Sequence, residues 1–493
     1  MFYSVIINSI INSIKDFSNR NAFYIGESYH TYAQFGQCVS KVRTQLTKTS
    51  YSNSKVGLVI NDDLETYASI IALWLEGDCY VPLHPGWPLE RCLDICEQVE
   101  LDLIVDSSKS SRYERGGVRI INTSKLQYET DNLTPKKRVS DEELAYILFT
   151  SGSTGKPKGV QLSRKNLASF VEAFFDVYDV NENDKCLQCF DLSFDLSIMS
   201  YLIPLLRGAC VYTVPPDVIK YSFVGSLIED EGLTVALMAP STIKYLKPYF
   251  DEIDCTSLKY SLFCGEALPL DVTKEWAKCA SNAIIDNVYG PTEDTIFCSI
   301  YRYNRDGENK AYNGILSIGK PMKGCGMTIF DENRNECPNG TLGELCLAGN
   351  QLTIGYHKNE EKNKESFFEK DGIRWYKTGD LCYKDADGDF MYSGRMDYQA
   401  KIQGFRVELG EIEYHAKDFL GDTNVACIAF DNQDALTEIA MFIESEEFNT
   451  KELLAYLNSK MPSYMIPKRI VFEQAFPLNS NGKLDRKTLK AKL

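Results

Sequence analysis

The chain has 493 residues, 44% of them hydrophobic and 25% charged, which is typical of a soluble globular protein but too long for a single hydrophobic core. A net charge of -16 argues against general binding of nucleic acids or anionic membranes. Sixteen cysteines are scattered along the sequence and no secretion signal is recognisable, so we expect reduced thiols in a cytoplasm.

Residues 1–17 carry an amphipathic pattern. Isoleucines recur there at helical spacing, at positions Ile6, Ile7, Ile10, Ile11 and Ile14. This pattern predicts a helix that docks on the rest of the chain. No basic segment precedes it and no apolar run has the length of a membrane span, so we expect neither a signal peptide nor membrane insertion.

Apolar runs alternate with helical patterns from residue 22 to about residue 106. We expect strands at 56–60 and 78–82 with a helix at 64–76 between them, which is the signature of βαβ units and a parallel sheet. Residues 107–139 are rich in Ser, Lys, Arg and Gly, and we expect them to be a mostly exposed connection.

A glycine-rich loop at residues 150–159 follows an apolar run at 144–149 that predicts a buried strand. Backbone N–H groups, hydroxyls and two lysines in such a loop can hold a phosphate, and Ser163 is the expected cap of the helix that follows. It is not the loop of P-loop NTPases, because Pro157 follows Lys156. The alternative is a flexible surface loop. The candidate phosphate-binding residues are Thr150, Ser151, Gly152, Ser153, Thr154, Gly155, Lys156 and Lys158.

A second alternating set spans residues 166–300, with strands expected at 209–213, 234–238 and 260–264. Residues 319–394 show short β-like runs between glycine turns, which predicts a small barrel or sandwich. Beyond residue 394 the pattern becomes α+β.

Polar groups gather in residues 287–293, which offer an aromatic ring, a tight turn, a hydroxyl and a carboxylate. They could stack a base, contact a phosphate and hold Mg²⁺ through oxygen, although a plain Gly-Pro turn is the alternative. Residues 375–381 and 393–398 each bring a charge to a glycine turn, and solvated turns are again the alternative. Lys483 after a glycine would usually be an exposed turn lysine.

The order of these motifs resembles that of the adenylate-forming ligases, and within them the amino-acid adenylation domains of nonribosomal peptide synthesis. The motifs are residues 150–159, 287–293, 376–380, 394–397, 401–408 and 481–486. Residues 194–199 and 263–269 add a likeness to the stand-alone D-alanine–D-alanyl carrier protein ligases. The resemblance implies a large α/β domain (1–394) of two doubly wound subdomains plus a small β-barrel. It also implies a hinge at 395–398 and a small mobile α+β domain (399–493).

The resemblance implies two half-reactions in one site. An amino-acid carboxylate attacks the α-phosphate of ATP to give an aminoacyl-adenylate and pyrophosphate, and the phosphopantetheine thiol of a separate carrier protein then takes the aminoacyl group. By position, Lys483 is the lysine between carboxylate and nucleotide, Thr292 the α-phosphate contact and Glu293 the Mg²⁺ ligand. Asp397 corresponds to the hinge.

Nucleotide contacts follow from the same resemblance. Tyr289 is expected to stack on adenine beside Gly290, with Asn287 at the edge of the base. Asp380 is expected to accept both ribose hydroxyls, a bidentate role that suits a carboxylate, with help from Arg395.

By the same resemblance, Asp195 corresponds to the residue that pairs with the substrate's α-ammonium group. A physical argument agrees, because burying a lone carboxylate in an apolar stretch is costly unless a cation meets it. A helix-start aspartate is the alternative. The remaining pocket positions are Leu196, Met199, Leu237, Leu262, Cys264, Gly265, Val288, Ile296 and Phe297. None is charged, and the bulk of Met199 and Phe297 favours a small substrate: D-alanine first, then glycine or a small L-amino acid.

Two other functions compete with this prediction. An acyl- or aryl-CoA ligase shares most of the motifs, but Asp195 argues against it because such substrates have no ammonium group. A catalytically inactive adenylate-binding protein is disfavoured by the retention of Lys483, Glu293 and Asp380. His84 and Gln403 depart from the family pattern, and Val288 and Phe297 leave the substrate's identity and stereochemistry open. We expect a monomer that binds no nucleic acid.

Overall fold

The computed structural model describes residues 1–114, 117–136, 139–152, 156–397, 399–421, 423–432, 436–477 and 484–493. They form two compact units. The first contains Met1–Pro85, Cys96–Leu148 and Gly159–Gly394, and the second contains Gly86–Ile95, Phe149–Lys158 and Arg395–Leu493. The hinge at 395–398 and the domain boundaries beside it stay predictions.

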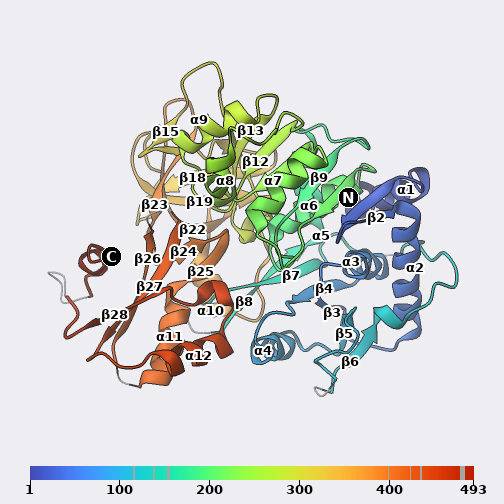
Figure 1. The fold of residues 1–493 in the computed structure, drawn as a ribbon, viewed down its shortest axis with the longest axis horizontal. Helices are drawn as coiled ribbons and strands as arrows, with labels where there is room; N and C mark the ends of the chain where they lie inside the picture. Colours follow the sequence, from blue (N-terminus) through green and yellow to red (C-terminus); the bar gives the residue numbers. More distant parts are fainter. Residues whose placement is uncertain are drawn as a thin grey trace. The chain divides into compact units, whose positions relative to one another are not determined.

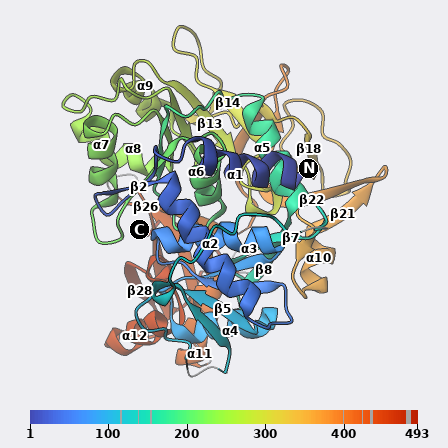
Figure 2. The same ribbon diagram turned by 90° about the vertical axis from the view of Figure 1, so that its right-hand side faces the viewer.

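The chain begins with the amphipathic helix that the isoleucine pattern predicted. A π-helical turn at Tyr3–Ile7 leads into α1 (Asn8–Asp16), and Ile6, Ile7, Ile10 and Ile14 are buried. Figure 2 shows α1 running beside α2 (Tyr32–Lys48) and α6 (Asp195–Leu205). The apolar face of the helix is therefore part of the main core.

A seven-stranded sheet has the order β20-β8-β7-β4-β3-β5-β6 (Figure 1). Its strands are β3 (Lys55–Val59), β4 (Cys79–Leu83), β5 (Leu103–Asp106), β6 (Arg119–Asn122), β7 (Leu144–Thr150), β8 (Lys158–Ser163) and β20 (Gly355–Tyr356). The helices that follow its strands include α3 (Leu64–Glu76) and α4 (Leu89–Val99). The predicted parallel pairing of β3 with β4 is confirmed. The prediction for residues 107–139 was incomplete, because β6 pairs in parallel with β5 and a 3₁₀ turn follows at Thr123–Lys125.

A nine-stranded sheet has the order β17-β14-β13-β12-β11-β9-β10-β1-β2. Its strands are β1 (Asn21–Ile25), β2 (Ser28–Thr31), β9 (Lys185–Gln188), β10 (Cys210–Thr213), β11 (Val235–Met238), β12 (Tyr260–Phe263), β13 (Ile284–Tyr289), β14 (Ser299–Arg302) and β17 (Lys320–Pro321). The helices between β8 and β13 in the chain are α5 (Arg164–Phe175), α6, α7 (Lys220–Asp230), α8 (Pro240–Leu246) with a 3₁₀ turn at Lys247–Tyr249, and α9 (Leu270–Cys279). Ser163 caps α5 through a capping box, as predicted.

A five-stranded antiparallel sheet completes the first unit. It contains β18 (Cys325–Phe330), β19 (Gly343–Gly349), β21 (Phe367–Lys370), β22 (Ile373–Lys384) and β23 (Phe390–Arg395). A ribbon of β15 (Ala311–Tyr312) and β16 (Ile315–Leu316) precedes it in sequence, and the helix α10 (Glu360–Ser366) lies between β20 and β21 in the chain. This small β structure matches the glycine-punctuated pattern of the sequence.

The second unit has the α+β character that the sequence predicted. It contains β24 (Gln399–Ile402), β25 (Phe405–Glu408), α11 (Leu409–Leu420), β26 (Val425–Asp431), β27 (Thr437–Glu444), α12 (Lys451–Lys460), a 3₁₀ turn at Ser463–Met465, β28 (Arg469–Glu473) and α13 (Arg486–Lys490). Strands β26, β27 and β28 form one sheet, and β24 pairs with β25.

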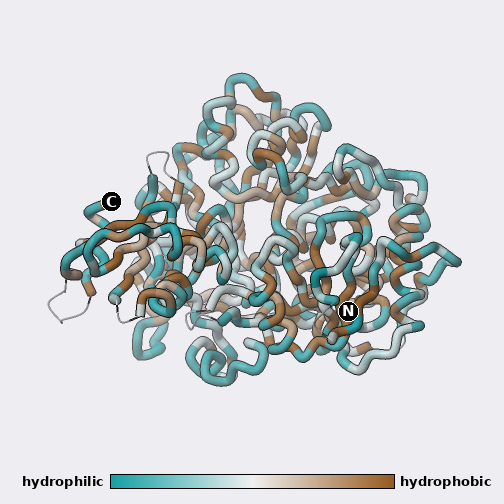
Figure 3. The backbone as a smooth tube through the Cα atoms, turned by 60° about the horizontal axis from the view of Figure 1, so that its bottom comes forward, coloured by the Kyte–Doolittle hydropathy of each residue, from teal (hydrophilic) through white to brown (hydrophobic). Residues whose placement is uncertain are grey.

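Hydrophobic and hydrophilic residues alternate along most of the chain, as Figure 3 shows, and the hydrophobic ones supply several buried cores. None of the sixteen cysteines forms a disulfide. Among the helices that the structure describes, none is long and apolar enough to cross a bilayer.

Candidate active site

Asp195 is the first residue of α6 and is buried, with 6% of its surface exposed. Its Oδ2 atom has no hydrogen-bond partner among the described residues. Burial raises the pKa of Asp195 to about 7, a hydrogen bond with the Thr292 side chain lowers it in part, and the charge of Glu293 raises it. The structure therefore brings together Asp195, Thr292 and Glu293, which lie about a hundred residues apart in the sequence, as the resemblance implied.

The turn that carries Thr292 and Glu293 has an unusual backbone. Its 3₁₀ turn Thr292–Asp294 is followed by Thr295 and Ile296 with φ of 51° and 74°, values that β-branched residues rarely adopt. Gln351 holds this backbone, because its Nε2 atom donates to the carbonyls of Asp294 (3.1 Å) and Phe297 (2.9 Å). The surrounding protein thus maintains a strained segment beside the buried carboxylates.

Gly290 is required by the same turn. A Cβ atom at this position would lie 2.4 Å from the Cα of Phe297 and 3.0 Å from the carbonyl oxygen of Ile296. The close approach of these two segments brings the end of β13 against the residues that line the predicted substrate pocket.

Glu293 is fully buried, and the Tyr356 hydroxyl donates to its Oε1 at 2.7 Å. Tyr356 lies on β20, so this bond fixes the carboxylate from a distant part of the chain. Neighbouring Asp294 is also buried. Burial raises the pKa of Asp294 to about 7, and the Cys298 thiol beside it lowers that pKa in part. No group of three or more His, Cys, Asp or Glu side chains within the described ranges could hold a metal ion alone.

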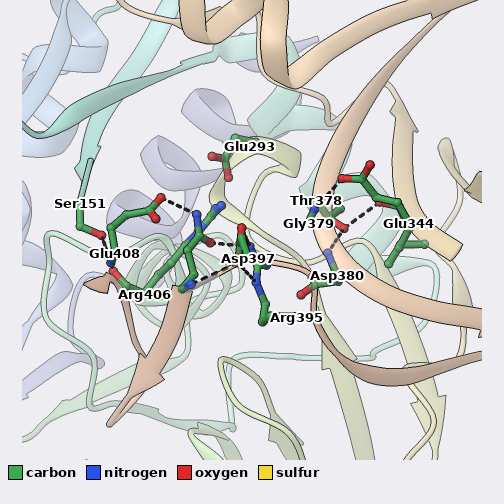
Figure 4. A network of polar contacts seen from close by, with 12 residues as sticks. Ser151, Glu293, Glu344, Thr378, Gly379, Asp380, Arg395, Asp397, Arg406 and Glu408 are labelled. Carbon is green, nitrogen blue, oxygen red and sulfur yellow. Dashed lines mark hydrogen bonds and ion pairs between the residues drawn. The ribbon is translucent and has the colours of Figure 1, made fainter. Parts of the chain in front are cut away.

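Asp380 lies on β22 and is held in a small network (Figure 4). The Tyr289 hydroxyl donates to Asp380 Oδ2 at 2.5 Å. The backbone N–H of Asp380 donates to Thr378 Oγ1 at 3.0 Å, and that of Gly379 donates to Glu344 Oε1 at 3.1 Å. The residues expected at adenine and ribose therefore lie side by side. Asn287, on the same strand as Tyr289, donates from Nδ2 to the carbonyl of Ser317 at 2.8 Å.

The predicted pocket residues gather in one hydrophobic core. Its buried members include Leu196, Met199, Leu237, Leu262, Cys264, Val288, Ile296 and Phe297. They come from α6, β11, β12, β13 and the turn after β13, except Cys264, which directly follows β12. Gly265 follows Cys264 with φ of 92°. None of these buried residues is charged, so none of them supplies a cationic partner for Asp195.

The glycine-rich loop belongs to the second unit in its described part. Glu408 N donates to Ser151 Oγ at 2.9 Å, Gly152 N donates to Glu411 Oε2 at 3.0 Å, and Lys158 Nζ contacts Glu408 Oε1 at 3.1 Å. Gly152 and Lys158, which were expected to contact a phosphate, therefore contact the carboxylates of Glu411 and Glu408 instead. Thr150 Oγ1 is buried without a partner among the described residues, and Lys156 Nζ lies 3.9 Å from Asp94. The predicted contacts Ser153, Thr154, Gly155 and Lys483 lie outside the described residues.

Arg395 and Asp397 form a bidentate ion pair within the second unit (Figure 4). Arg395 Nε lies 2.8 Å from Asp397 Oδ1, and its Nη2 lies 2.5 Å from Oδ2. Burial raises the pKa of Asp397, but the hydrogen bond and charge of Arg395 outweigh it and hold that pKa below its ordinary value. The backbone N–H of Gln399 also donates to Asp397 (3.2 Å), so this carboxylate organises the predicted hinge segment.

Sequence comparison shows which family this fold, with its buried carboxylates and its tyrosine–aspartate pair, belongs to. The profile of the AMP-binding enzyme family matches residues 12–357, more than half of the chain. The chain therefore belongs to the AMP-binding enzyme family.

Individual relatives are similar over almost the whole chain. It is 29% identical to the D-alanine–D-alanyl carrier protein ligase of Bacillus licheniformis, over 98% of this chain and 99% of that protein. It is 31% identical to zwittermicin A synthase ZmaJ of Bacillus cereus, over 88% of this chain and 84% of that protein. It is also 31% identical to tyrocidine synthase 3 of Brevibacillus parabrevis over 88% of this chain, but it spans only 7% of that much longer protein.

A solved structure shows the same fold. The Vibrio cholerae adenylation domain AlmE, in complex with glycyl-adenosine-5'-phosphate, superimposes with a TM-score of 0.87 at 25% identity. The match covers 98% of this chain and 97% of AlmE. The predicted fold class, a large α/β domain followed by a small α+β domain, is therefore confirmed.

Proposed function

We propose that this protein activates a small amino acid as its aminoacyl-adenylate, with ATP, and transfers it to the phosphopantetheine thiol of a separate carrier protein. The observation that carries the proposal is the buried carboxylate of Asp195, one oxygen of which has no partner among the described residues. A carboxylate in such surroundings is stable when it is protonated or when a cation meets it. The α-ammonium group of an amino acid is such a cation.

The first half-reaction brings two anions together, so cationic groups must offset their repulsion. In our proposal the substrate carboxylate attacks the α-phosphate, and the bond to pyrophosphate breaks. Lys483 contacts both the carboxylate and the nucleotide, while Thr292 contacts the α-phosphate. Tyr289 stacks on adenine, and Asp380 accepts the ribose hydroxyls. Asn287 lies at the edge of the base.

Magnesium fits the residues present. Mg²⁺ in nucleotide sites usually takes one or two carboxylates together with substrate phosphates. Glu293, buried and fixed by Tyr356, supplies one such carboxylate. When bound, the ion offsets phosphate charge.

The substrate that the pocket supports best is D-alanine, followed by glycine or a small L-amino acid. The pocket residues carry no charge, and Phe297 packs edge-on against Phe170 with 5.0 Å between ring centroids, which fixes a bulky group there. Support also comes from the full-length similarity to a D-alanine ligase and from the glycyl-adenylate held by AlmE.

Amino-acid-dependent exchange of pyrophosphate into ATP tests the proposal. The assay is run over a panel of amino acids with both enantiomers of alanine, and over fatty and aryl acids. Exchange that requires a small amino acid is the expected result. Exchange that requires a fatty or aryl acid would assign a CoA ligase instead, and no exchange with any acid would assign an inactive adenylate-binding protein.

The second half-reaction is proposed to require rotation about Asp397. Proline at this position fixes φ near about −65° and removes a backbone N–H, so Asp397→Pro should restrict that rotation. We expect pyrophosphate exchange to fall less than about threefold and transfer to a phosphopantetheinylated carrier protein to fall at least about tenfold. Asp397→Asn, which keeps the backbone free, is the control. Equal losses in both half-reactions would contradict the hinge role.

A further inference from the structure

An ion pair joins the loops that follow two central strands of the first unit. His84 comes directly after β4 of the seven-stranded sheet, and Asp191 lies three residues after β9 of the nine-stranded sheet. His84 Nε2 lies 2.7 Å from Asp191 Oδ2, and the two side chains are 27% and 19% exposed. The carboxyl ends of parallel strands are where ligands bind in open α/β sheets, so this pair lies at the functional edge of both sheets.

Asp191 organises the turn that leads to α6. Its Oδ1 accepts the backbone N–H of Ser193 at 2.7 Å and the Ser193 hydroxyl at 2.6 Å. Its carbonyl oxygen accepts the N–H of Phe194 at 2.9 Å. Phe194 is the residue before α6, and Asp195 is the first residue of that helix. Three hydrogen bonds to one residue thus set the backbone path that delivers the Asp195 carboxylate to the pocket.

The contacts of Asp191 favour its anionic form. Burial raises the pKa of Asp191, but hydrogen bonds from His84 and Ser193 and the charge of His84 hold it below its ordinary value. Asp191 Oδ1 accepts the hydrogen bonds from Ser193, and Asp191 Oδ2 contacts His84. The imidazole therefore restrains the carboxylate without displacing the hydrogen bonds that form the turn.

The backbone of His84 is itself held by Arg112. The Arg112 guanidinium donates from Nη2 to the carbonyl of His84 at 2.8 Å and from Nη1 to that of Pro85 at 3.0 Å. A continuous chain of contacts therefore runs from Arg112 through His84 and Asp191 to the start of α6.

We propose that His84, acting through Asp191, is a positioning residue that sets the Asp195 carboxylate for the substrate's ammonium group. This inference rests on the proposed function of Asp195 and deepens it. It also gives a role to His84, which departs from the family pattern.

The test compares His84→Ala with His84→Gln, in which the amide nitrogen can reach Asp191 in place of Nε2. We expect His84→Ala to raise KM for the amino acid about tenfold while KM for ATP changes less than about twofold, because only the ammonium contact is displaced. His84→Gln should restore most of the affinity. His357→Ala is the matched control, since His357 is also partly buried and pairs through Nδ1 with Gln161 at 3.1 Å, away from this turn. It should change neither KM.

Hydrogen–deuterium exchange gives a readout that does not depend on activity. Peptides covering residues 189–197 should exchange faster in His84→Ala than in wild type or His357→Ala. A wild-type enzyme without amino-acid-dependent activity would overturn the proposed function. With an active wild type, an unchanged KM for the amino acid, or equal rises in both KM values, would overturn the positioning role. Unchanged exchange of these peptides would overturn it as well.

Discussion

Replacing Lys483 by alanine is expected to abolish adenylate formation while ATP still binds. In the proposed first half-reaction the amino-acid carboxylate approaches a nucleotide that is already strongly anionic. A single ammonium group between them acts mainly in the transition state, where the two negative charges are closest. Removing it should lower amino-acid-dependent pyrophosphate exchange by about 10²–10³-fold, as the loss of one preorganised cationic or polar donor usually does.

The control for this variant is Lys487→Ala, which removes an exposed lysine from α13, four residues further along. ATP binding, measured by equilibrium titration without amino acid, should stay within about threefold of wild type in both variants, because adenine and ribose contacts come from other residues. Undiminished exchange in Lys483→Ala would remove the basis of the assignment. A similar loss in Lys487→Ala would show that general charge, not this lysine, matters.

Several structural features near the candidate site could be predicted because the motifs that carry them are recognisable in the sequence. Helix α3 has the bounds that the sequence predicted, and it begins with Asp63 as its cap and ends at a glycine with φ of 87°. Asp195, Thr292 and Glu293 converge, and Tyr289 reaches Asp380. The order of the motifs and the family resemblance that it carries pointed to these residues, and their roles in binding and catalysis stay predictions.

The supporting contacts could not be predicted, because they join residues that no local pattern relates. Tyr356 donates a hydrogen bond to Glu293, which is 63 positions away in the sequence. Gln351 holds the strained turn at Thr295, because its side-chain amide donates to three backbone carbonyls and its backbone carbonyl accepts the Thr295 hydroxyl. The strand β6 was missed because its single buried residue leaves no alternation to detect. The hairpin of β1 and β2 joins the edge of a sheet whose other strands come much later in the chain, so no local signal indicates its partner.

Replacing Asp195 by asparagine should have opposite effects on activity and on stability. The amide cannot offer the charge that an ammonium group needs in an apolar pocket, so KM for the amino acid should rise by at least about a hundredfold, with KM for ATP little changed. In the wild type, amino-acid affinity should improve as pH rises through about 7, because the pKa of buried Asp195 is raised to about 7 and binding requires its anion. The variant should lack this pH dependence.

Stability should change in the other direction. A carboxyl group whose pKa is raised on folding contributes stability that is fully present below its unfolded pKa and is lost as pH rises through its folded pKa. For Asp195 that loss falls between about pH 4 and the folded pKa of about 7. Asparagine does not titrate, so the variant should melt at a higher temperature than wild type at pH 8, and this difference should shrink towards pH 4.

Asp78→Asn is the control that separates the effect on amino-acid affinity from the effect on pH-dependent stability. Asp78 is buried just before β4, at the opposite end of that strand from His84, and burial raises its pKa to about 6 despite a hydrogen bond from Tyr51. Its replacement should shift the melting temperature with pH in a similar sense while leaving KM for the amino acid unchanged. An Asp195→Asn enzyme that keeps wild-type affinity for amino acids would disprove the ammonium contact. A variant that loses affinity and also melts lower at pH 8 would show that Asp195 is a structural anion, already paired within the protein and not reserved for a substrate.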